Sequence, residues 1–533
     1  MGILDVLTKN IIWVTSLVWL FILLVYVFKT QNKKLHSLKE IKVATIFRTE
    51  HKDWIVIVLF TLLMVQALIN LIGALGPELA FDALWYHLTL PKFYLLHNMI
   101  YHIPGGLLYY SDMPKLGEML YTGALSFGNE IFPKLIHSIF GILTAIVLFK
   151  LSQKFFNRNI SLLIVVIFYS NLVVDWESIT AYIDLIRTFF ELLALWGLLN
   201  WYESQKYTWL IVSALMIGLE ITTKLLAMGS FFILLLLCLI ISFIKGTKIK
   251  NILIGTVIYA FCTFIIPLPW FIFSYFHTGN PVFPFFTKTY EISASSPNPA
   301  LILSDLWNLF IHSADPISPI YLIFLPLLFI FYSKFTRELK IIIWYSGLSL
   351  VLWYFTPRTG GGRFILPYLP AFSIICGAIY SEIIKKKDSR WKYTGNILLL
   401  TIIFISCISI MYRGIANKRY IPVILGLESK QKFLSNNLNY HYGDFYDTDN
   451  YFVNHIKPTD SVLLYGFHNL YYVNFPFIDS SWLTKGDMFN FVATQNTKLP
   501  VKYRNWQLVY SNDKTMVQLY KPPKGICSKL CRF

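Results

Sequence analysis

The sequence predicts an all-α polytopic membrane protein that ends in a small extracytoplasmic lobe. The chain has 533 residues, of which 56% are hydrophobic and only 14% are charged, whereas an ordinary soluble domain carries about 25% charge. A soluble fold this apolar would expose large apolar patches, which soluble proteins avoid. The apolar residues also gather in runs long enough to cross a bilayer. These observations exclude a globular cytoplasmic enzyme and a disordered chain.

The apolar runs predict twelve membrane-spanning helices, because a span needs about 20 mostly apolar residues. They lie at residues 10–28, 54–75, 132–151, 160–175, 183–201, 207–222, 225–244, 252–274, 316–333, 341–355, 364–384 and 394–412. The first run could instead be a signal peptide. Its apolar stretch is long for one, and no small-x-small cleavage site follows, so we expect a retained anchor helix.

Basic residues predict how these helices are oriented. The formal net charge is +17, and lysines and arginines collect in alternate loops, within residues 29–52, 154–158, 245–250, 334–340 and 385–392. Cytoplasmic loops of membrane proteins carry such an excess. We therefore expect a multi-pass protein of the cell membrane, with both termini outside the cytoplasm. Membrane lipids are the expected surroundings, and no nucleic acid partner is expected.

This layout divides the chain into three parts. Residues 1–53 form an extra N-terminal anchor with a basic cytoplasmic loop, residues 54–412 form the membrane domain, and residues 413–533 form a C-terminal extracytoplasmic domain. Between residues 76 and 131, apolar and polar residues mix around Pro91. That pattern suits short amphipathic helices lying in the interface plane.

Two segments of the C-terminal part have strand patterns. Ser461 to Gly466 predicts a strand that ends in a turn, and Asp513 to Tyr520 predicts one arm of a hairpin. We expect a small α/β or β-rich lobe on the outer membrane surface.

Carboxylates are few in the outer loops, and the first of these loops opens with Glu78 and Asp82. Asp82 and Tyr86 are four residues apart and share one face of a helix, with His87 somewhat to the side. A carboxylate among aromatic residues at the membrane edge is suited to be a general base. The alternative is that Asp82 only caps the short helix that begins at Ala83.

A second acidic group precedes the span at residues 183–201. Asp184 lies at or just inside this helix, and ionisable residues within spans are costly and usually functional. The structural alternative is that Arg187, three residues later, neutralises Asp184. The two outer acids could also hold a divalent cation between them.

Two cations on the same side of the membrane are candidates for binding phosphate. Lys224 lies between two apolar runs, although Glu220, four residues earlier, could simply pair with it. Arg363 follows three glycines, and a Gly-rich turn exposes backbone N–H groups while an arginine can grip phosphate oxygens. The alternative is a flexible loop with a snorkelling arginine.

Other chemistry is not indicated. His97, His102 and His137 lack metal-ligand spacing, and no zinc motif occurs. Four cysteines lie inside apolar runs, while Cys527 and Cys531 could pair if the C-terminus is in an oxidising compartment.

The order of these motifs resembles the GT-C superfamily of polytopic glycosyltransferases. The likeness is to bacterial relatives of the protein O-mannosyltransferases and of the lipid A aminoarabinose transferase. It rests on five segments: Asp82-x-x-x-Tyr86-His87-Leu-x-x-Pro91, Thr180-Ala-Tyr-Ile-Asp184, Thr223-Lys224, Thr278-Gly-Asn-Pro-Val-Phe-Pro284 and Arg363-Phe-Ile-Leu-Pro-Tyr-Leu-Pro370. The superfamily often has two adjacent acids in the first motif, whereas Ala83 follows Asp82 here.

The resemblance implies an enzyme that uses a polyprenyl-phosphate-linked sugar outside the cytoplasm. Asp82 would be the general base, and Asp184 would assist it. Lys224 and Arg363 would stabilise the leaving phosphate. Glu78, Tyr86 and His87 would contribute to substrate binding, and the acceptor would be a lipid, a glycan or a protein.

Two other functions remain open at this point. A surface-polysaccharide polymerase or ligase also joins lipid-linked sugars, but a long Arg-rich loop late in the chain would favour it, and the long acidic loop here is early. A lipid-linked-sugar transporter or flippase would be expected to show inverted repeats and polar residues at the bilayer midplane. The sequence contains no evident repeat, and its polar residues cluster at one membrane face.

Overall fold

The computed structural model describes residues 10–15, 18, 54–287, 302–311, 316–356, 358–523 and 531–532. Most of the first predicted span, at 10–28, lies outside these residues, as does most of the part assigned to residues 1–53. Cys527 is also outside them, so the predicted pairing with Cys531 stays a prediction.

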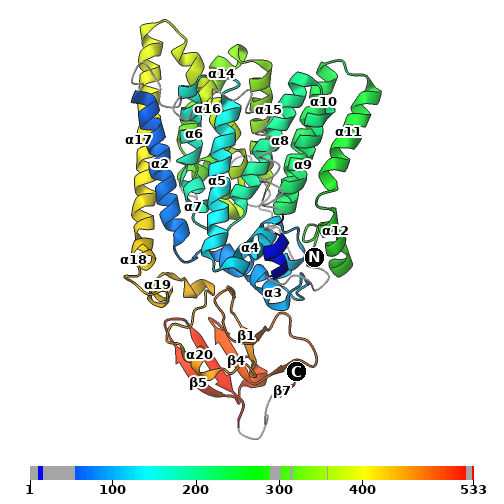
Figure 1. The fold of residues 1–533 in the computed structure, drawn as a ribbon, viewed down its shortest axis with the longest axis vertical. Coiled ribbons are helices and arrows are strands. Elements are labelled where there is room, and N and C mark those ends of the chain that lie inside the picture. Colours follow the sequence, from blue (N-terminus) through cyan, green and yellow to red (C-terminus); the bar gives the residue numbers. More distant parts are fainter. Residues whose placement is uncertain are drawn as a thin grey trace.

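A bundle of helices makes up most of the molecule (Figure 1). Its helices are α2 (Trp54–Leu75), α5 (Ile131–Ser152), α6 (Arg158–Tyr169), α7 (Leu172–Glu177), α8 (Asp184–Ser204), α9 (Tyr207–Thr223), α10 (Met228–Ile244), α11 (Ile249–Phe264), α12 (Leu268–Thr278), α13 (Ile302–Ile311), α14 (Ile320–Phe331), α15 (Arg337–Phe355), α16 (Leu369–Ile384) and α17 (Ser389–Asn417). Six described segments are long and apolar enough to cross a membrane, or up to seven if a bent pair counts as one span. The predicted class is confirmed, whereas the count of twelve spans is not.

Burial separates the helices of the bundle into central and peripheral ones. The span that contains α16 is 89% buried over its most apolar window, and the equivalent figure for α2 is 17%. A helix that is apolar on all sides can lie at the centre of the bundle or at its edge, so its packing against other helices decides between the two. Gly377 in α16 lets α6 approach closely, because a Cβ there would lie 2.3 Å from the Cγ1 of Ile164.

Two predicted spans are corrected by the structure. The run at 160–175 is not one helix: α6 ends at Tyr169, and α7 starts after Asn171, because Ser and Asn favour caps and turns over helix interiors. The run at 252–274 is divided into α11 and α12, which meet at an angle of 64°. Pro267 lies at that break, where it lacks a backbone N–H and cannot continue the helix.

Short helices occupy the first outer loop, as predicted. They are η3 (Ala83–His87), α3 (Thr89–His97), η4 (Tyr109–Asp112) and α4 (Leu116–Phe127). Pro91 does not interrupt α3, because it lies in the first turn, where a proline is tolerated.

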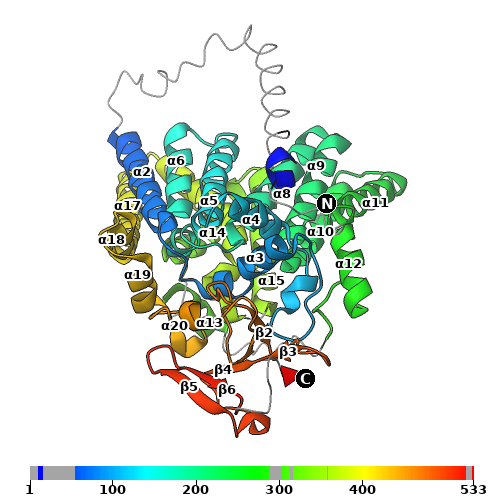
Figure 2. The ribbon, with the colours of Figure 1, turned by 60° about the horizontal axis from the view of Figure 1, so that its bottom comes forward.

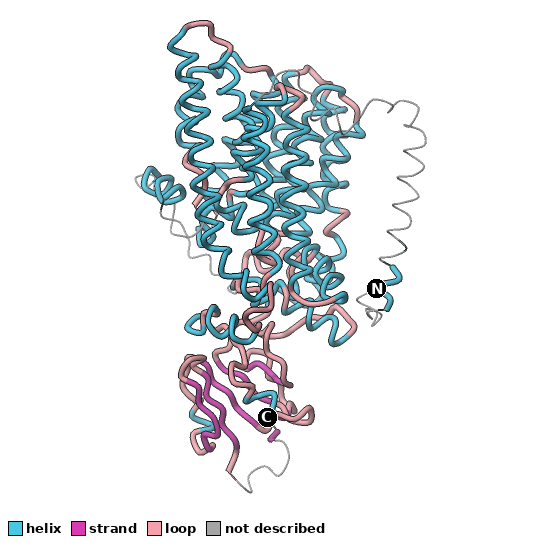
Figure 3. Tube along the Cα trace, turned by 60° about the vertical axis from the view of Figure 1, so that its left-hand side comes forward, coloured by secondary structure: helices cyan, strands magenta, loops and turns pink. Residues whose placement is uncertain are grey.

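The C-terminal lobe contains a mixed five-stranded sheet in the order β2-β1-β4-β6-β5. Its strands are β1 (Val462–Tyr465), β2 (Phe477–Asp479), β4 (Phe491–Gln495), β5 (Gln507–Asn512) and β6 (Val517–Lys521), and β3 (Met488–Phe489) pairs separately with β7 (Cys531–Arg532). Short helices α18 (Ile421–Ile424), α19 (Lys430–Asn437) and α20 (Tyr451–His455) accompany them. Strands β1 and β6 confirm the two predicted strand segments. Figure 3 shows that, among the described residues, all strands lie in the lobe.

The lobe packs against the first outer loop rather than standing apart from it (Figures 1 and 2). Phe93 and Tyr94 of α3 share one apolar core with Val462 and Leu464 of β1. The Nζ of Lys92 also donates to the carbonyl oxygen of Tyr471 at 2.8 Å. The lobe and the first outer loop therefore form one continuous surface at the same end of the bundle.

Candidate active site

Asp82 directly precedes the π-helical turn η3 and occupies its N-cap position. Its side chain makes no capping hydrogen bond, so the proposed capping role is wrong. The backbone N–H of Leu88 bonds to the carbonyl of Ala83, five residues earlier, and single π turns of this kind occur often at functional sites. The turn leaves the carboxylate of Asp82 available for side-chain partners.

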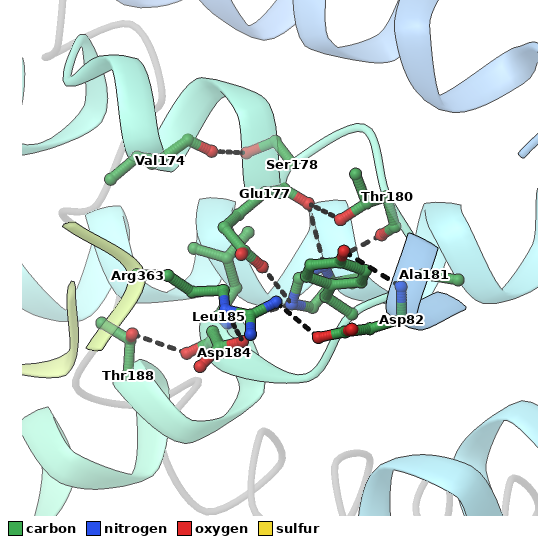
Figure 4. A network of polar contacts seen from close by, with 12 residues as sticks. Asp82, Val174, Glu177, Ser178, Thr180, Ala181, Asp184, Leu185, Thr188 and Arg363 are labelled. Atoms are coloured by element: carbon green, nitrogen blue, oxygen red, sulfur yellow. Dashed lines mark hydrogen bonds and ion pairs between the residues drawn. The ribbon is translucent and has the colours of Figure 1, made fainter. Parts of the chain in front are cut away.

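The partner of Asp82 is Arg363. Arg363 Nη1 donates to Asp82 Oδ2 at 2.7 Å, and Arg363 Nε lies 3.8 Å from Asp184 Oδ2 (Figure 4). Lys224 Nζ donates to the other oxygen of Asp184, Oδ1, at 2.6 Å. Two acids and two cations, chosen from four separate segments of the sequence, therefore form one cluster.

Exposure divides the cluster into two layers. The side chains of Asp82, Arg363 and Lys224 are 15–17% exposed, whereas that of Asp184 is 1% exposed. A buried carboxylate needs compensating charge, which the two cations supply. Asp184 therefore holds Lys224 and Arg363 from behind, and the other three side chains remain accessible.

The local ion pairs considered from sequence spacing do not form between side chains. Arg187 does not neutralise Asp184, because its Nε donates to Glu220 Oε1 at 2.8 Å. Glu220 is thereby committed to Arg187 and not to Lys224. The same guanidinium donates through Nη2 to the hydroxyl of Tyr368 at 3.0 Å, which ties α8 to the segment that follows Arg363.

Arg363 lies in a 3-10 segment, η8 (Arg358–Phe364), that is kinked at Gly361. Gly361 has a φ of 50° and a ψ of −131°, a conformation that only glycine adopts readily. The next turn, η9 (Leu366–Tyr368), contains Pro367 and leads into α16. The Gly-rich turn therefore directs Arg363 onto the two carboxylates, and a freely snorkelling arginine is not what the structure shows.

Glu78 lies beside the cluster but does not join it. Its carboxylate accepts hydrogen bonds from the backbone N–H groups of Leu79, Ala80 and Ala181, and the side chain is buried. Burial raises the pKa of Glu78, opposed by the charge of Lys134. Glu78 thus joins the first outer loop to the loop before Asp184, which is a positioning role.

Tyr86 and His87 lie behind the cluster. Tyr86 stacks on Tyr110 with ring centroids 3.6 Å apart. Burial and the charge of Asp82 raise the pKa of Tyr86 well above its usual range, so its hydroxyl stays protonated. His87 Nδ1 lies 2.6 Å from Glu118 Oε1, and both side chains are buried.

Tyr182 is a site residue that sequence reasoning missed. The guanidinium of Arg363 lies 4.8 Å from the centroid of its ring, and its hydroxyl accepts a hydrogen bond from the backbone N–H of Asp82 at 3.2 Å. Burial and Asp82 raise the pKa of Tyr182 well above its usual range. Its place two residues before Asp184 was the available signal.

A metal bridge between Asp82 and Asp184 does not fit these residues. The guanidinium of Arg363 contacts both carboxylates and already supplies their counter-charge. Within the described ranges, no group of three His, Cys, Asp or Glu side chains could hold a metal ion.

Solved structures share the fold of this protein over nearly the whole chain. The ArnT protein of Cupriavidus metallidurans, bound to undecaprenyl phosphate, is similar with a TM-score of 0.59 at 9% sequence identity, covering 89% of this chain and 98% of that one. The protein has the fold of ArnT. The apo form of ArnT matches this chain with a TM-score of 0.56 at 11% identity, covering 88% of this chain and 97% of that chain.

Two further comparisons agree with this fold. An oligosaccharyltransferase of Archaeoglobus fulgidus, in complex with zinc and sulfate, is similar with a TM-score of 0.51 at 12% identity, covering 87% of this chain and 74% of that one. Residues 121–272 match the family model of the dolichyl-phosphate-mannose-protein mannosyltransferases, a segment that includes Asp184 and Lys224. No curated protein sequence matches the chain.

Proposed function

We propose that this protein transfers a sugar from a polyprenyl-phosphate-linked donor to an acceptor hydroxyl at the extracytoplasmic face of the cell membrane. The observation that carries the proposal is the contact of Arg363 with both Asp82 and Asp184. It joins acids and cations from four distant segments at the lobe end of the bundle. The likeness to ArnT with bound undecaprenyl phosphate supports the same donor class.

The two cations and Asp82 have different roles in the transfer. Arg363 and Lys224 bind the donor phosphate, whose negative charge grows as the bond to the sugar breaks. Asp82 takes the proton of the acceptor hydroxyl as that oxygen attacks the anomeric carbon. Attack from the face opposite the phosphate inverts the anomeric centre, and no covalent intermediate with the protein is needed.

The ion pair between Arg363 and Asp82 links the two substrates. One oxygen of the Asp82 carboxylate, Oδ2, accepts a hydrogen bond from Arg363 Nη1 at 2.7 Å and is therefore not free to meet the acceptor hydroxyl. When the donor phosphate arrives, it competes with Asp82 for the guanidinium. Donor binding would therefore release the base, and an acceptor alone would meet a neutralised carboxylate.

The surroundings of Arg363 suit a lipid donor. Two residues after it, Ile365 lines a narrow apolar cavity of about 60 Å³ together with Phe310, Tyr321 and Leu369. This cavity lies between α13, α14 and α16, inside the bundle. A prenyl chain attached to a phosphate at Arg363 would find apolar surface there.

Mass spectrometry of lipid-linked sugars and envelope glycans tests the proposal. Cells that lack the gene are complemented with the wild type, with Asp82→Asn, or with Asp513→Asn, which alters an exposed carboxylate in the turn between β5 and β6. We expect the wild type and Asp513→Asn to restore one sugar to its acceptor, and Asp82→Asn to leave the donor accumulated. Restoration by Asp82→Asn contradicts the assignment, and loss of long polymer instead of a single sugar favours the polymerase or ligase.

A further inference from the structure

A row of aromatic rings lies beside Asp82, on the side of the first outer loop and the lobe. We name it the aromatic platform; its members are Phe81, Trp85, Tyr109, Tyr110 and His468. Ring centroids are 5.7 Å apart for Phe81 and Trp85, 5.2 Å for Trp85 and Tyr110, and 4.2 Å for Tyr109 and Tyr110. The platform begins at the residue next to the proposed base.

The platform belongs to two parts of the fold. His468, from the lobe, lies 4.6 Å from the ring of Trp85 and 5.4 Å from that of Phe81. Trp85 is fixed by a hydrogen bond from its Nε1 to the carbonyl oxygen of Leu107 at 2.9 Å. The buried Tyr86 stacks against Tyr110 from behind. The rings are therefore held in place before any ligand binds.

The exposure of the platform distinguishes it from the neighbouring core. Phe93, Phe452 and Phe475, in the core shared by loop and lobe, are all buried. All five platform rings are only half-buried. Tyr110 is stacked between Tyr86 and Tyr109, so the accessible surface of the platform belongs mainly to its other rings. Half-buried aromatic rings that are held in place offer a large contact area at low entropic cost, which is why they line binding sites.

The chemistry of the platform fits a sugar ring. An aromatic face carries partial negative charge, which attracts the weakly positive C–H groups on one face of a pyranose. The hydroxyls around the sugar then need polar partners at the rim. Asp82, whose side chain is partly exposed, is such a partner at the end of the platform nearest the cluster.

The position of the platform relative to Asp82 indicates that it binds the acceptor and not the donor. The phosphate-binding cations contact Phe364, with Lys224 Nζ 5.1 Å from its ring, and the apolar cavity begins at Ile365. The platform instead runs from Phe81 through η3 and η4 to the lobe. In a one-step displacement the acceptor approaches opposite the leaving phosphate, so the side away from the cations is the acceptor side.

We infer that the aromatic platform binds a sugar ring of the acceptor, so that the acceptor is a glycan. The inference rests on the proposed function. The acceptor hydroxyl gives its proton to Asp82, its oxygen forms a bond to the anomeric carbon of the donor sugar, and the bond from that carbon to the phosphate oxygen breaks. The electron pair of the broken bond leaves with the polyprenyl phosphate.

Kinetics of the purified full-length chain in lipid nanodiscs test the inference. A lipid-linked sugar extract of the source cells is the donor, and the acceptors are glycans cleaved from the same envelope or a serine-rich and threonine-rich peptide. Phe81→Leu and Trp85→Leu remove platform rings, Trp85→Phe keeps a ring, and Tyr442→Leu alters an exposed aromatic residue elsewhere in the lobe.

We expect both leucine variants to raise the KM for the glycan by up to about tenfold, with the donor KM unchanged. Trp85→Phe keeps a ring but loses the Nε1 hydrogen bond, so it should raise this KM less than Trp85→Leu. Tyr442→Leu should stay near the wild type. An unchanged glycan KM in both leucine variants, or transfer to the peptide in place of the glycan, overturns the inference. If the wild type releases no polyprenyl phosphate from the donor with any acceptor, the proposed function itself fails.

Discussion

Arg363 Nη1 lies 2.7 Å from Asp82 Oδ2, although the two residues are 281 positions apart in the chain. This contact places the Gly-rich turn before α16 against the first outer loop. It also means that the proposed base is neutralised while no donor is bound. Binding of the donor phosphate and release of the base then become one event, so the carboxylate is free to meet the acceptor hydroxyl only when the donor is in place.

Removal of either cation should weaken donor binding. Arg363→Gln and Lys224→Gln each remove a charged donor near the expected phosphate, and hydrogen bonds to charged groups contribute about 1.5–3 kcal/mol. We expect the donor KM to rise by roughly 10- to 100-fold in each variant, with a smaller effect on the acceptor KM. Steady-state kinetics with varied donor measure this. Lys385→Gln, at an exposed position between α16 and α17, is the matched control, and equal donor KM values in all variants would show that Arg363 and Lys224 are structural.

Asp184 should be needed for its charge and not for a metal. Its carboxylate positions Lys224 and Arg363, so Asp184→Asn should lower kcat/KM for the donor by about tenfold or more. Treatment of the wild type with a chelator should leave the rate unchanged, because Arg363 already neutralises the two acids. Initial rates before and after chelation, with Mg²⁺ or Mn²⁺ restored, measure this. Recovery of lost activity by one of these ions would refute it.

The hydrogen bond between Arg187 and Tyr368 should position Arg363 from a distance. Tyr368→Phe leaves the packing in place but frees the α16 side of the site from α8, so we expect a donor KM about threefold higher, in line with single hydrogen bonds inside membrane proteins. Tyr259→Phe is the control, because its buried hydroxyl bonds to Ser213 outside this network. The donor KM and the thermal stability of both variants are measured, which separates positioning of Arg363 from general structural support. If both variants lose stability equally and the donor KM does not change, Tyr368 does not position Arg363.

The cluster of acids and cations shows what sequence reasoning could reach. The sequence indicated four ionisable residues on one membrane face as functional candidates, because such residues are costly near the bilayer: Asp82, Asp184, Lys224 and Arg363. The structure places them together. Their pairing was not predictable, because spacing of three or four residues favours local pairs such as Glu220 with Lys224. Arg187 decides between these options by binding Glu220, and it does so through a helix–helix contact that only the packed bundle reveals.

The remaining differences also have physical causes. Glu118 contacts His87, which is 31 positions away in the sequence, so no local pattern marks it. Tyr182 was marked only by its place two residues before Asp184. The division of the 252–274 run follows from Pro267, whose effect inside an apolar run depends on whether neighbouring helices compensate for the missing hydrogen bond. The attachment of the lobe to the first outer loop rests on residues such as Lys92, whose partner in the lobe is 379 positions away in the sequence.

Topology decides whether the site faces the lipid-linked donor. In a cysteine-free background, Pro104→Cys and Tyr442→Cys place exposed thiols in the first outer loop and the lobe, and Lys386→Cys places one between α16 and α17. An impermeant maleimide should label the first two in intact cells, and the third only after the membrane is opened. The opposite labelling pattern would place the site in the cytoplasm.

The most direct test of the account is a single-turnover assay with the purified chain in lipid vesicles, supplied with donor and acceptor, in which released polyprenyl phosphate is measured over time. Asp82→Asn preserves size but cannot accept the proton, and general-base catalysis contributes typically 10²- to 10⁴-fold. We expect Asp82→Asn to bind the donor normally and to release polyprenyl phosphate at least about 10²-fold more slowly than the wild type. Release by Asp82→Asn at a rate close to that of the wild type would contradict it.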